Sequence, residues 1–222
     1  MLLAVDASTQ WMGLALYDGA QVLAETIWRT RNHHTVELAP ALDTLIRRNG
    51  FTPNQLKAAA VALGPGSFTS LRIGLAVVKG LALSQKLPVI GIPTLDILAA
   101  GQPIKDIPMI AVLQAGRGRL AIVNYLSNGK EWVAQGDPQV STAEELSHQI
   151  KGPTLICGEL SADERQMLGR KYKNVILASP AQCVRRPAIL AELAWKRLLA
   201  GKTDDVISLS PIYLHVAEEI PG

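Results

Sequence analysis

Two short polar segments carry residue types that could bind a nucleotide. The first is Asp6-Ala7-Ser8-Thr9, which ends an apolar run at residues 2–5. A carboxylate and two hydroxyls at the tip of a β-hairpin can position Mg²⁺ and phosphate through water. Such side chains more commonly satisfy the backbone groups of a turn. The local spacing favours this structural role.

The second segment is the loop GPGSFTSLRIG at residues 64–74, which opens a long apolar helix. Gly64 and Gly66 permit backbone conformations closed to other residues, and Ser67 offers a hydroxyl to the free N–H groups of the helix. A loop at the positive end of a helix could hold an anion. The P-loop spacing GxxxxGK[ST] is absent, because Lys79-Gly80 lies inside the helix. A structural or partner-docking role is therefore favoured.

Other catalytic chemistry finds little support. The four histidines lack metal-ligand spacing, and the adjacent His33 and His34 are expected to be exposed at a helix entrance. No Gly-x-Ser-x-Gly elbow occurs. The turn Gln114–Arg119, where a second phosphate loop would belong, has no acidic residue. We predict neither a metal nor a cofactor.

The pattern of predicted elements repeats across the chain. Each half begins with three strands joined by tight turns and continues with alternating helices and strands. The predicted strands are residues 2–5, 12–17, 22–28, 58–63, 88–92, 109–113, 120–126, 131–134, 154–157 and 175–178. This layout predicts an α/β protein of the actin-like (ASKHA, ribonuclease H-like) fold with duplicated lobes at 1–103 and 104–222. The last helix, 188–199, is a candidate to pack back on the first lobe.

The helix after the glycine loop is apolar on two sides. One stripe contains Leu71, Leu75, Val78 and Ala82, and a second contains Ile73, Val77 and Leu81. A surface helix needs one stripe to meet its own core. A second stripe indicates burial between layers or a partner protein, and the sequence leaves both open.

Composition excludes several classes of protein. Hydrophobic residues make up 48% of the 222, which argues against disorder. The net charge of +3 is too small to indicate nucleic-acid binding by itself. No apolar run is long enough to span a membrane, and the N-terminus does not resemble a signal peptide. We expect a cytoplasmic protein with reduced cysteines.

Several motifs together resemble the TsaB (YeaZ) family. They are the opening LLAVDAST, the loop GPGSFTSLRIG leading into GLAVVKGLAL, the segment PVIGIPTLDILA and the closing SPIYL. The resemblance is close over residues 1–101 and concerns mainly layout beyond them. It implies an actin-like scaffold without catalysis of its own. Such a scaffold serves synthesis of N6-threonylcarbamoyladenosine at position 37 of ANN-decoding tRNAs.

The resemblance also implies partners. The paralogue TsaD would form a heterodimer with the chain and carry the metal, a TsaE-type ATPase would join them, and tRNA would bind only through the complex. The His-x-x-x-His metal pair of TsaD falls here on Thr94 and Leu98, which cannot replace imidazole. Pairing with TsaD, or with a second copy, is expected through the first two long helices. The expected contact residues are Leu38, Leu42, Leu45, Leu71, Leu75, Val78 and Ala82.

Two alternative functions stay open at this point. One is a degenerate actin-fold ATPase or sugar-kinase-like nucleotide-binding protein that uses Asp6, Ser8 and Thr9 for Mg²⁺ and phosphate. The other is a metallopeptidase of the glycoprotease type, which the missing metal-ligand spacing disfavours.

Overall fold

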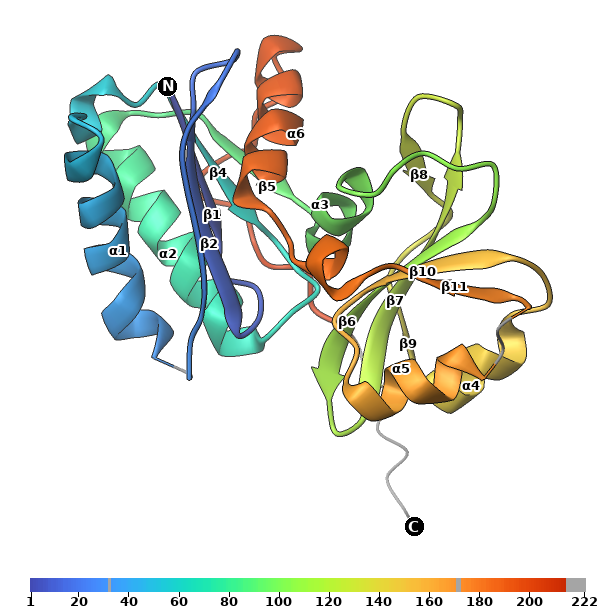
Figure 1. Ribbon diagram of the computed structural model, residues 1–222. Helices are drawn as coiled ribbons and strands as arrows, with labels where there is room; N and C mark the ends of the chain where they lie inside the picture. The colour runs from blue at the N-terminus through green and yellow to red at the C-terminus, as the bar shows by residue number, and fades with distance from the viewer. Residues whose placement is uncertain (32, 171–172, 215–222) are drawn as a thin grey trace.

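The first lobe of the computed structural model is built on a five-stranded mixed sheet (Figure 1). The structure describes residues 1–31, 33–170 and 173–214. The strand order is β3-β2-β1-β4-β5, in which β1–β3 are antiparallel and β1, β4 and β5 are parallel. The strands are β1 (Leu2–Asp6), β2 (Trp11–Tyr17), β3 (Val22–Arg29), β4 (Ala58–Ala62) and β5 (Val89–Ile92).

The second lobe repeats this arrangement. Its sheet has the order β11-β10-β6-β7-β8, again with an antiparallel hairpin followed by parallel strands. The shared order confirms the predicted duplicated, actin-like α/β fold. The sequence missed the short β9, which pairs with β7. The strands are β6 (Met109–Gly116), β7 (Arg119–Ser127), β8 (Trp132–Ala134), β9 (Gln139–Ser141), β10 (Thr154–Gly158) and β11 (Val175–Leu177).

Helices cover both faces of the first sheet. On one face lie α1 (His34–Arg48) and α2 (Phe68–Gln85), and on the other lies α6 (Pro187–Leu199), from the end of the chain (Figure 1). The apolar side chains of α6 share a core with Leu2, Ala60 and Ile90 of the sheet. The N-terminal sheet is thus completed by the C-terminal helix.

A short helix joins the two lobes. Helix α3 (Thr94–Ala100) places Ile97 in the core beneath α6, while Leu95 and Leu98 belong to the core of the second sheet. The far face of the second sheet is covered by α4 (Ala143–Gln149) and α5 (Ala162–Gly169). Within the described ranges, none of the helices is long and apolar enough to cross a membrane.

Candidate functional site

A buried arginine links the two lobes at the point where β1 and β10 end. Arg185 follows the short 3-10 helix η2 (Pro180–Cys183), and only 1% of its side chain is exposed. Its Nε donates to Asp6 Oδ2 at 2.8 Å, and its Nη1 pairs with Glu159 Oε1. Its Nη2 donates to Thr9 Oγ1 at 2.8 Å and to the carbonyl of Trp11 at 3.4 Å. One guanidinium therefore bridges both sheets.

The polar side chains of the first segment are all engaged inside the protein. Ser8 donates to Asp6 Oδ1 through its backbone N–H, at 2.9 Å, and through its hydroxyl. Thr9 donates its hydroxyl to Glu159 Oε1 at 2.7 Å. The three predicted residues thus come together, but their oxygens are occupied by neighbouring groups of the chain.

The positive charge of Arg185 lies directly against the carboxylates of Asp6 and Glu159. Burial by itself would lower the pKa of the Arg185 guanidinium, because the charged form loses its hydration. The carboxylates of Asp6 and Glu159 outweigh this effect and raise that pKa above its ordinary value. Arg185 therefore stays charged at every pH at which the fold survives.

The glycine loop packs directly on the first segment. The Ser67 N–H donates to the Ser8 carbonyl at 2.7 Å. A Cβ on Gly66 would lie 2.2 Å from the same carbonyl oxygen, so only glycine fits there. Gly64 has a φ of +112° and donates its N–H to Thr94 Oγ1 at 2.9 Å. These two N–H groups therefore have partners inside the chain, and the loop joins the first polar segment to Thr94.

Sequence reasoning missed Arg185 and Glu159. Glu159 directly follows the predicted strand 154–157 and Gly158, whose φ of +129° turns the chain at that point. This acidic residue at a strand end was an available signal. Nothing in the local sequence connects it with an arginine 26 residues later. Their pairing follows only from the way the lobes meet.

The two adjacent histidines have different environments. His33 is exposed beside Glu37. His34 is buried, and its Nε2 lies 2.8 Å from the carbonyl oxygen of Thr9. The expectation that both are exposed is wrong for His34. This residue ties the start of α1 to the first polar segment.

Two further positions that were considered for a metal, Thr94 and Leu98, have structural roles. Thr94 holds the glycine loop, and Leu98 is buried in the second core. Gln114 donates to Glu164 Oε2 at 2.7 Å, and Arg117, with a φ of +52°, is exposed at its turn. In the part of the chain that the structure describes, no three His, Cys, Asp or Glu side chains are grouped to hold a metal.

Six of the seven residues expected to contact a partner are buried and therefore do not form part of the protein surface. Leu42 is the one of the seven that is partly exposed. Five of the buried six belong to the core of the first lobe: Leu38, Leu45, Leu75, Val78 and Ala82. The sixth is Leu71. The residue assignment is therefore wrong for these six. The stripe assigned to a partner is the one that α2 turns toward its own sheet.

The outer surface of α1 and α2 carries a different set of apolar residues. Val36 is 67% exposed and Leu83 65% exposed. The small residues Ala39 of α1 and Ala76 and Gly80 of α2 are exposed as well. We call this set (Val36, Ala39, Ala76, Gly80 and Leu83) the outer face.

Among the residues that the structure describes, none explains why position 80 is a glycine. A Cβ built on it would meet nothing within 4 Å, although glycine inside a helix is less favourable than alanine. Gly74, on the same helix, has an internal reason, because its Cβ would lie 3.0 Å from that of Ala7. Small residues on an outer helix face allow close approach of another backbone.

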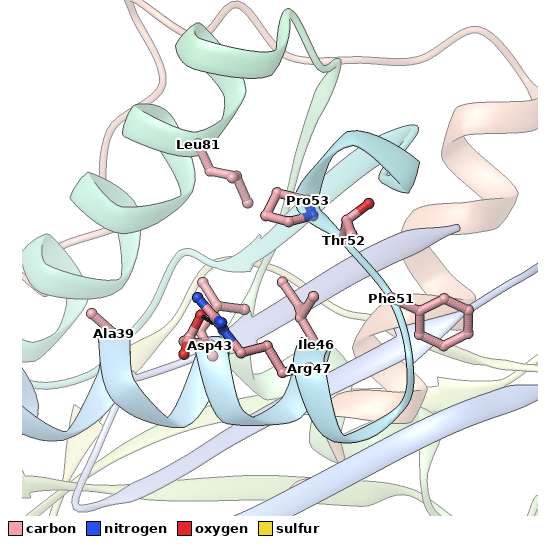
Figure 2. A pocket seen from close by; sticks show the side chains of 9 residues that line it. Ala39, Asp43, Ile46, Arg47, Phe51, Thr52, Pro53 and Leu81 are labelled. Carbon is pink, nitrogen blue, oxygen red and sulfur yellow. Dashed lines mark hydrogen bonds and ion pairs between the residues drawn. The ribbon is translucent and has the colours of Figure 1, made fainter.

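An apolar groove of about 390 Å³ adjoins the outer face between α1 and α2. Figure 2 shows Leu81 reaching from α2 toward Pro53, with Ile46 on the α1 side. Asp43 and Arg47, paired at 2.6 Å, stand at its rim. The groove could receive an apolar side chain of a partner.

Comparisons with a family model, with curated protein sequences and with solved structures all lead to the same group of proteins. The family model "TsaD: tRNA N6-adenosine threonylcarbamoyltransferase" matches residues 21–177. The tRNA threonylcarbamoyladenosine biosynthesis protein TsaB of Bacillus subtilis (strain 168) is 32% identical, with 98% of this chain and 95% of that protein aligned. The TsaB of Escherichia coli (strain K12) is 28% identical over 100% of this chain and 98% of its own length. The structure of YeaZ from Pseudomonas aeruginosa shares the fold, with a TM-score of 0.78, 23% identity, and coverage of 96% and 99% of the two chains.

Proposed function

The chain belongs to the TsaB family of tRNA threonylcarbamoyladenosine biosynthesis proteins, and on this premise we propose that it is the non-catalytic partner of a TsaD-type threonylcarbamoyltransferase. In this proposal the transferase modifies N6 of adenosine 37 in ANN-decoding tRNAs. A TsaE-type ATPase joins the pair, and tRNA is bound through the complex in the cytoplasm. The chain itself contributes a docking surface.

The observation that carries the proposal is the outer face, above all Gly80. This glycine lowers helix propensity at a position where the chain has ample room for a side chain. A partner helix that packs closely against α2 would explain it, since interhelical distance depends on the side chains at the contact. The neighbouring groove supplies a pocket of the kind that anchors an interface.

The lack of catalysis is supported by the state of the polar segments. Asp6, Ser8 and Thr9 are engaged with one another, Arg185 and Glu159. The Ser67 N–H that could receive a phosphate is hydrogen-bonded to Ser8. A nucleotidase or peptidase would need free ligands for metal, water or phosphate at these positions.

The test is reconstitution with the transferase and ATPase of the same organism, tRNA, ATP and threonylcarbamoyl-adenylate as the donor of the transferred group. Modification of tRNA should require this chain, and Ala76→Glu should abolish both co-purification with the transferase and modification. The control is Leu199→Glu, since Leu199 is an exposed apolar residue on α6, away from the outer face. Binding that survives Ala76→Glu would place the interface elsewhere. ATP hydrolysis or peptide cleavage by the purified chain would contradict the non-catalytic role.

The outer face would also pair with a second copy of the chain when the transferase is absent. If so, the homodimer and the heterodimer are mutually exclusive. Adding transferase to the isolated protein should then convert a homodimer into a heterodimer in sedimentation or light-scattering measurements. A complex that contains the transferase together with an intact homodimer of this chain would show that the two pairings use different surfaces.

A further inference from the structure

We infer that the side chains of Phe68, Arg72 and Tyr213 form a preassembled contact for a carboxylate of the transferase-type partner. We call these three residues the arginine platform. It lies where α2 begins, and the C-terminal segment supplies one of its members. The inference rests on the proposed function, because it takes the same partner. It adds a charged contact to the apolar outer face and brings the end of the chain into the docking surface.

Two aromatic rings hold the guanidinium of Arg72 in place. Its Cζ lies 3.8 Å from the centre of the Phe68 ring and 5.9 Å from that of the Tyr213 ring. Its Nε donates to the hydroxyl of Tyr213 at 2.9 Å. The centres of the two rings are 5.0 Å apart, and their planes are inclined by 32°. Since a guanidinium is attracted to the face of an aromatic ring, Arg72 is oriented before a partner arrives.

The C-terminal segment is itself tied to α2 and to the strand that precedes it. Ile212 donates its N–H to the carbonyl of Leu63 at 2.7 Å. Further back along the segment, the carbonyl of Ile207 accepts from Lys79 Nζ at 3.0 Å. These hydrogen bonds fix the backbone on both sides of residues 208–211. The position of Tyr213 beside α2 is therefore set by the backbone as well as by its own ring.

The positive charge of Arg72 has no acidic partner among the residues that the structure describes. Arg185, Arg186 and Arg197, in contrast, each pair with a carboxylate. The one hydrogen bond that the Arg72 side chain makes to a described residue uses Nε, which leaves its two Nη groups to donate. Such groups bind the two oxygens of a carboxylate through parallel hydrogen bonds. The O–H of Tyr213, whose oxygen accepts from Nε, is available to donate to the same carboxylate.

The arginine platform continues the outer face along α2. Phe68, Arg72, Ala76 and Gly80 are all exposed and follow one another at every fourth position of the helix. Residues at this spacing lie on the same side of a helix. A partner that packs over Ala76 and Gly80 therefore meets the platform as well. Phe68 is 53% exposed, and aromatic residues and arginine are enriched where proteins meet.

The surroundings favour a protein carboxylate over RNA. The Phe68 ring already contacts both the guanidinium of Arg72 and the ring of Tyr213, whereas a stacked base needs a free aromatic face. Lys79, on the same helix, already donates to the carbonyl of Ile207. RNA binding draws on several cations that reach phosphates. The single oriented guanidinium fits one carboxylate beside an apolar contact.

The experiment is calorimetric titration of the transferase into wild type, Arg72→Ala and Arg72→Lys. Arg72→Ala should weaken the affinity roughly 10- to 100-fold. Arg72→Lys should lose most of the affinity as well, because an ammonium group cannot form the paired hydrogen bonds. The control Arg170→Ala removes an exposed arginine from the second lobe and should leave the affinity unchanged. Unfolding temperatures measured alongside separate a loss of affinity from a loss of fold.

Double-mutant cycles identify the carboxylate. Each exposed Asp or Glu of the transferase is replaced by Ala and titrated against wild type and Arg72→Ala. One of these replacements should weaken the binding of wild type and have little further effect on Arg72→Ala. If no acidic residue shows this coupling, or if Arg72→Ala behaves like Arg170→Ala, the inference is wrong.

The outcomes also distinguish this inference from the proposed function. If Ala76→Glu abolishes binding while Arg72→Ala leaves the affinity unchanged, the outer face docks the transferase and the inference alone is overturned. If Ala76→Glu leaves binding intact while Arg72→Ala weakens it, the arginine platform is a contact and the outer face is not. If Arg72→Ala weakens the binding of tRNA in filter assays but not that of the transferase, the platform contacts RNA and the inference is overturned.

Discussion

Gly80→Ala offers a test in which stability and binding should change in opposite directions. Gly80 lies inside α2, and a Cβ there would meet none of the described residues within 4 Å. Alanine should therefore stabilise the isolated chain by about 0.5–1 kcal/mol, through the lower conformational entropy of its unfolded state. For a protein of this size, that gain corresponds to a rise of roughly 1–4 °C in unfolding temperature.

The same methyl group should weaken the complex. If a partner helix packs against Gly80, the added Cβ overfills the contact at a cost of about 1–3 kcal/mol. This cost weakens the affinity for the transferase by roughly 5- to 150-fold. Urea unfolding of the free chain and calorimetric titration with the transferase measure the two effects.

Two glycines provide matched controls for this test. Gly169, at the end of α5, has space for a Cβ and lies outside the outer face, so Gly169→Ala should leave affinity unchanged. Gly74→Ala should lack the stability gain, because its Cβ would crowd Ala7. If Gly80→Ala stabilises the chain and binds the transferase with unchanged affinity, the explanation given for Gly80 is refuted.

Three further changes have defined outcomes. Asp6→Asn removes one of the two carboxylates that pair with the buried guanidinium of Arg185, and urea titrations should show the free energy of unfolding lowered by about 3–5 kcal/mol. A loss below about 1 kcal/mol would show that this ion pair contributes little to stability. Asp96→Asn should raise the free energy of unfolding at neutral pH, because burial raises the pKa of Asp96 despite the hydrogen bond from Tyr125. This gain in stability should shrink as the pH falls through the folded-state pKa of Asp96 and vanish below about pH 4. A gain in stability that does not depend on pH would exclude this cause. Leu83→Glu should abolish transferase binding with an unchanged unfolding temperature, whereas Leu199→Glu should leave binding intact; equal effects of the two would argue against a specific outer face.

The sequence predicted those features that depend on local pattern. Alternating and helical periodicity located nearly all the elements, because each signal lies within its own segment. The three-residue β9 is too short to show a period. The two polar segments were recognised separately, and the structure shows them in contact through Ser8 and Gly66.

Orientation and long-range pairing could not be predicted in the same way. Both stripes of α2 are apolar, so composition did not reveal that Leu75 is buried in the first core while Ile73 and Val77 are only partly buried against it. Arg185 and Glu159 pair across the lobes, and neither belongs to a motif. The small residue Gly80 became informative only when its surroundings were known.

The position of α6 has a consequence for biosynthesis on the ribosome. The strands of the first sheet are made early, but the helix that covers one of their faces comes from residues 187–199. Until residues 187–199 have been synthesised, an apolar face that includes Leu2, Ala60 and Ile90 lacks its cover. Although domains made first generally fold first, this lobe must wait for the last helix. The nascent chain would therefore be a natural client for chaperones that bind exposed apolar surface.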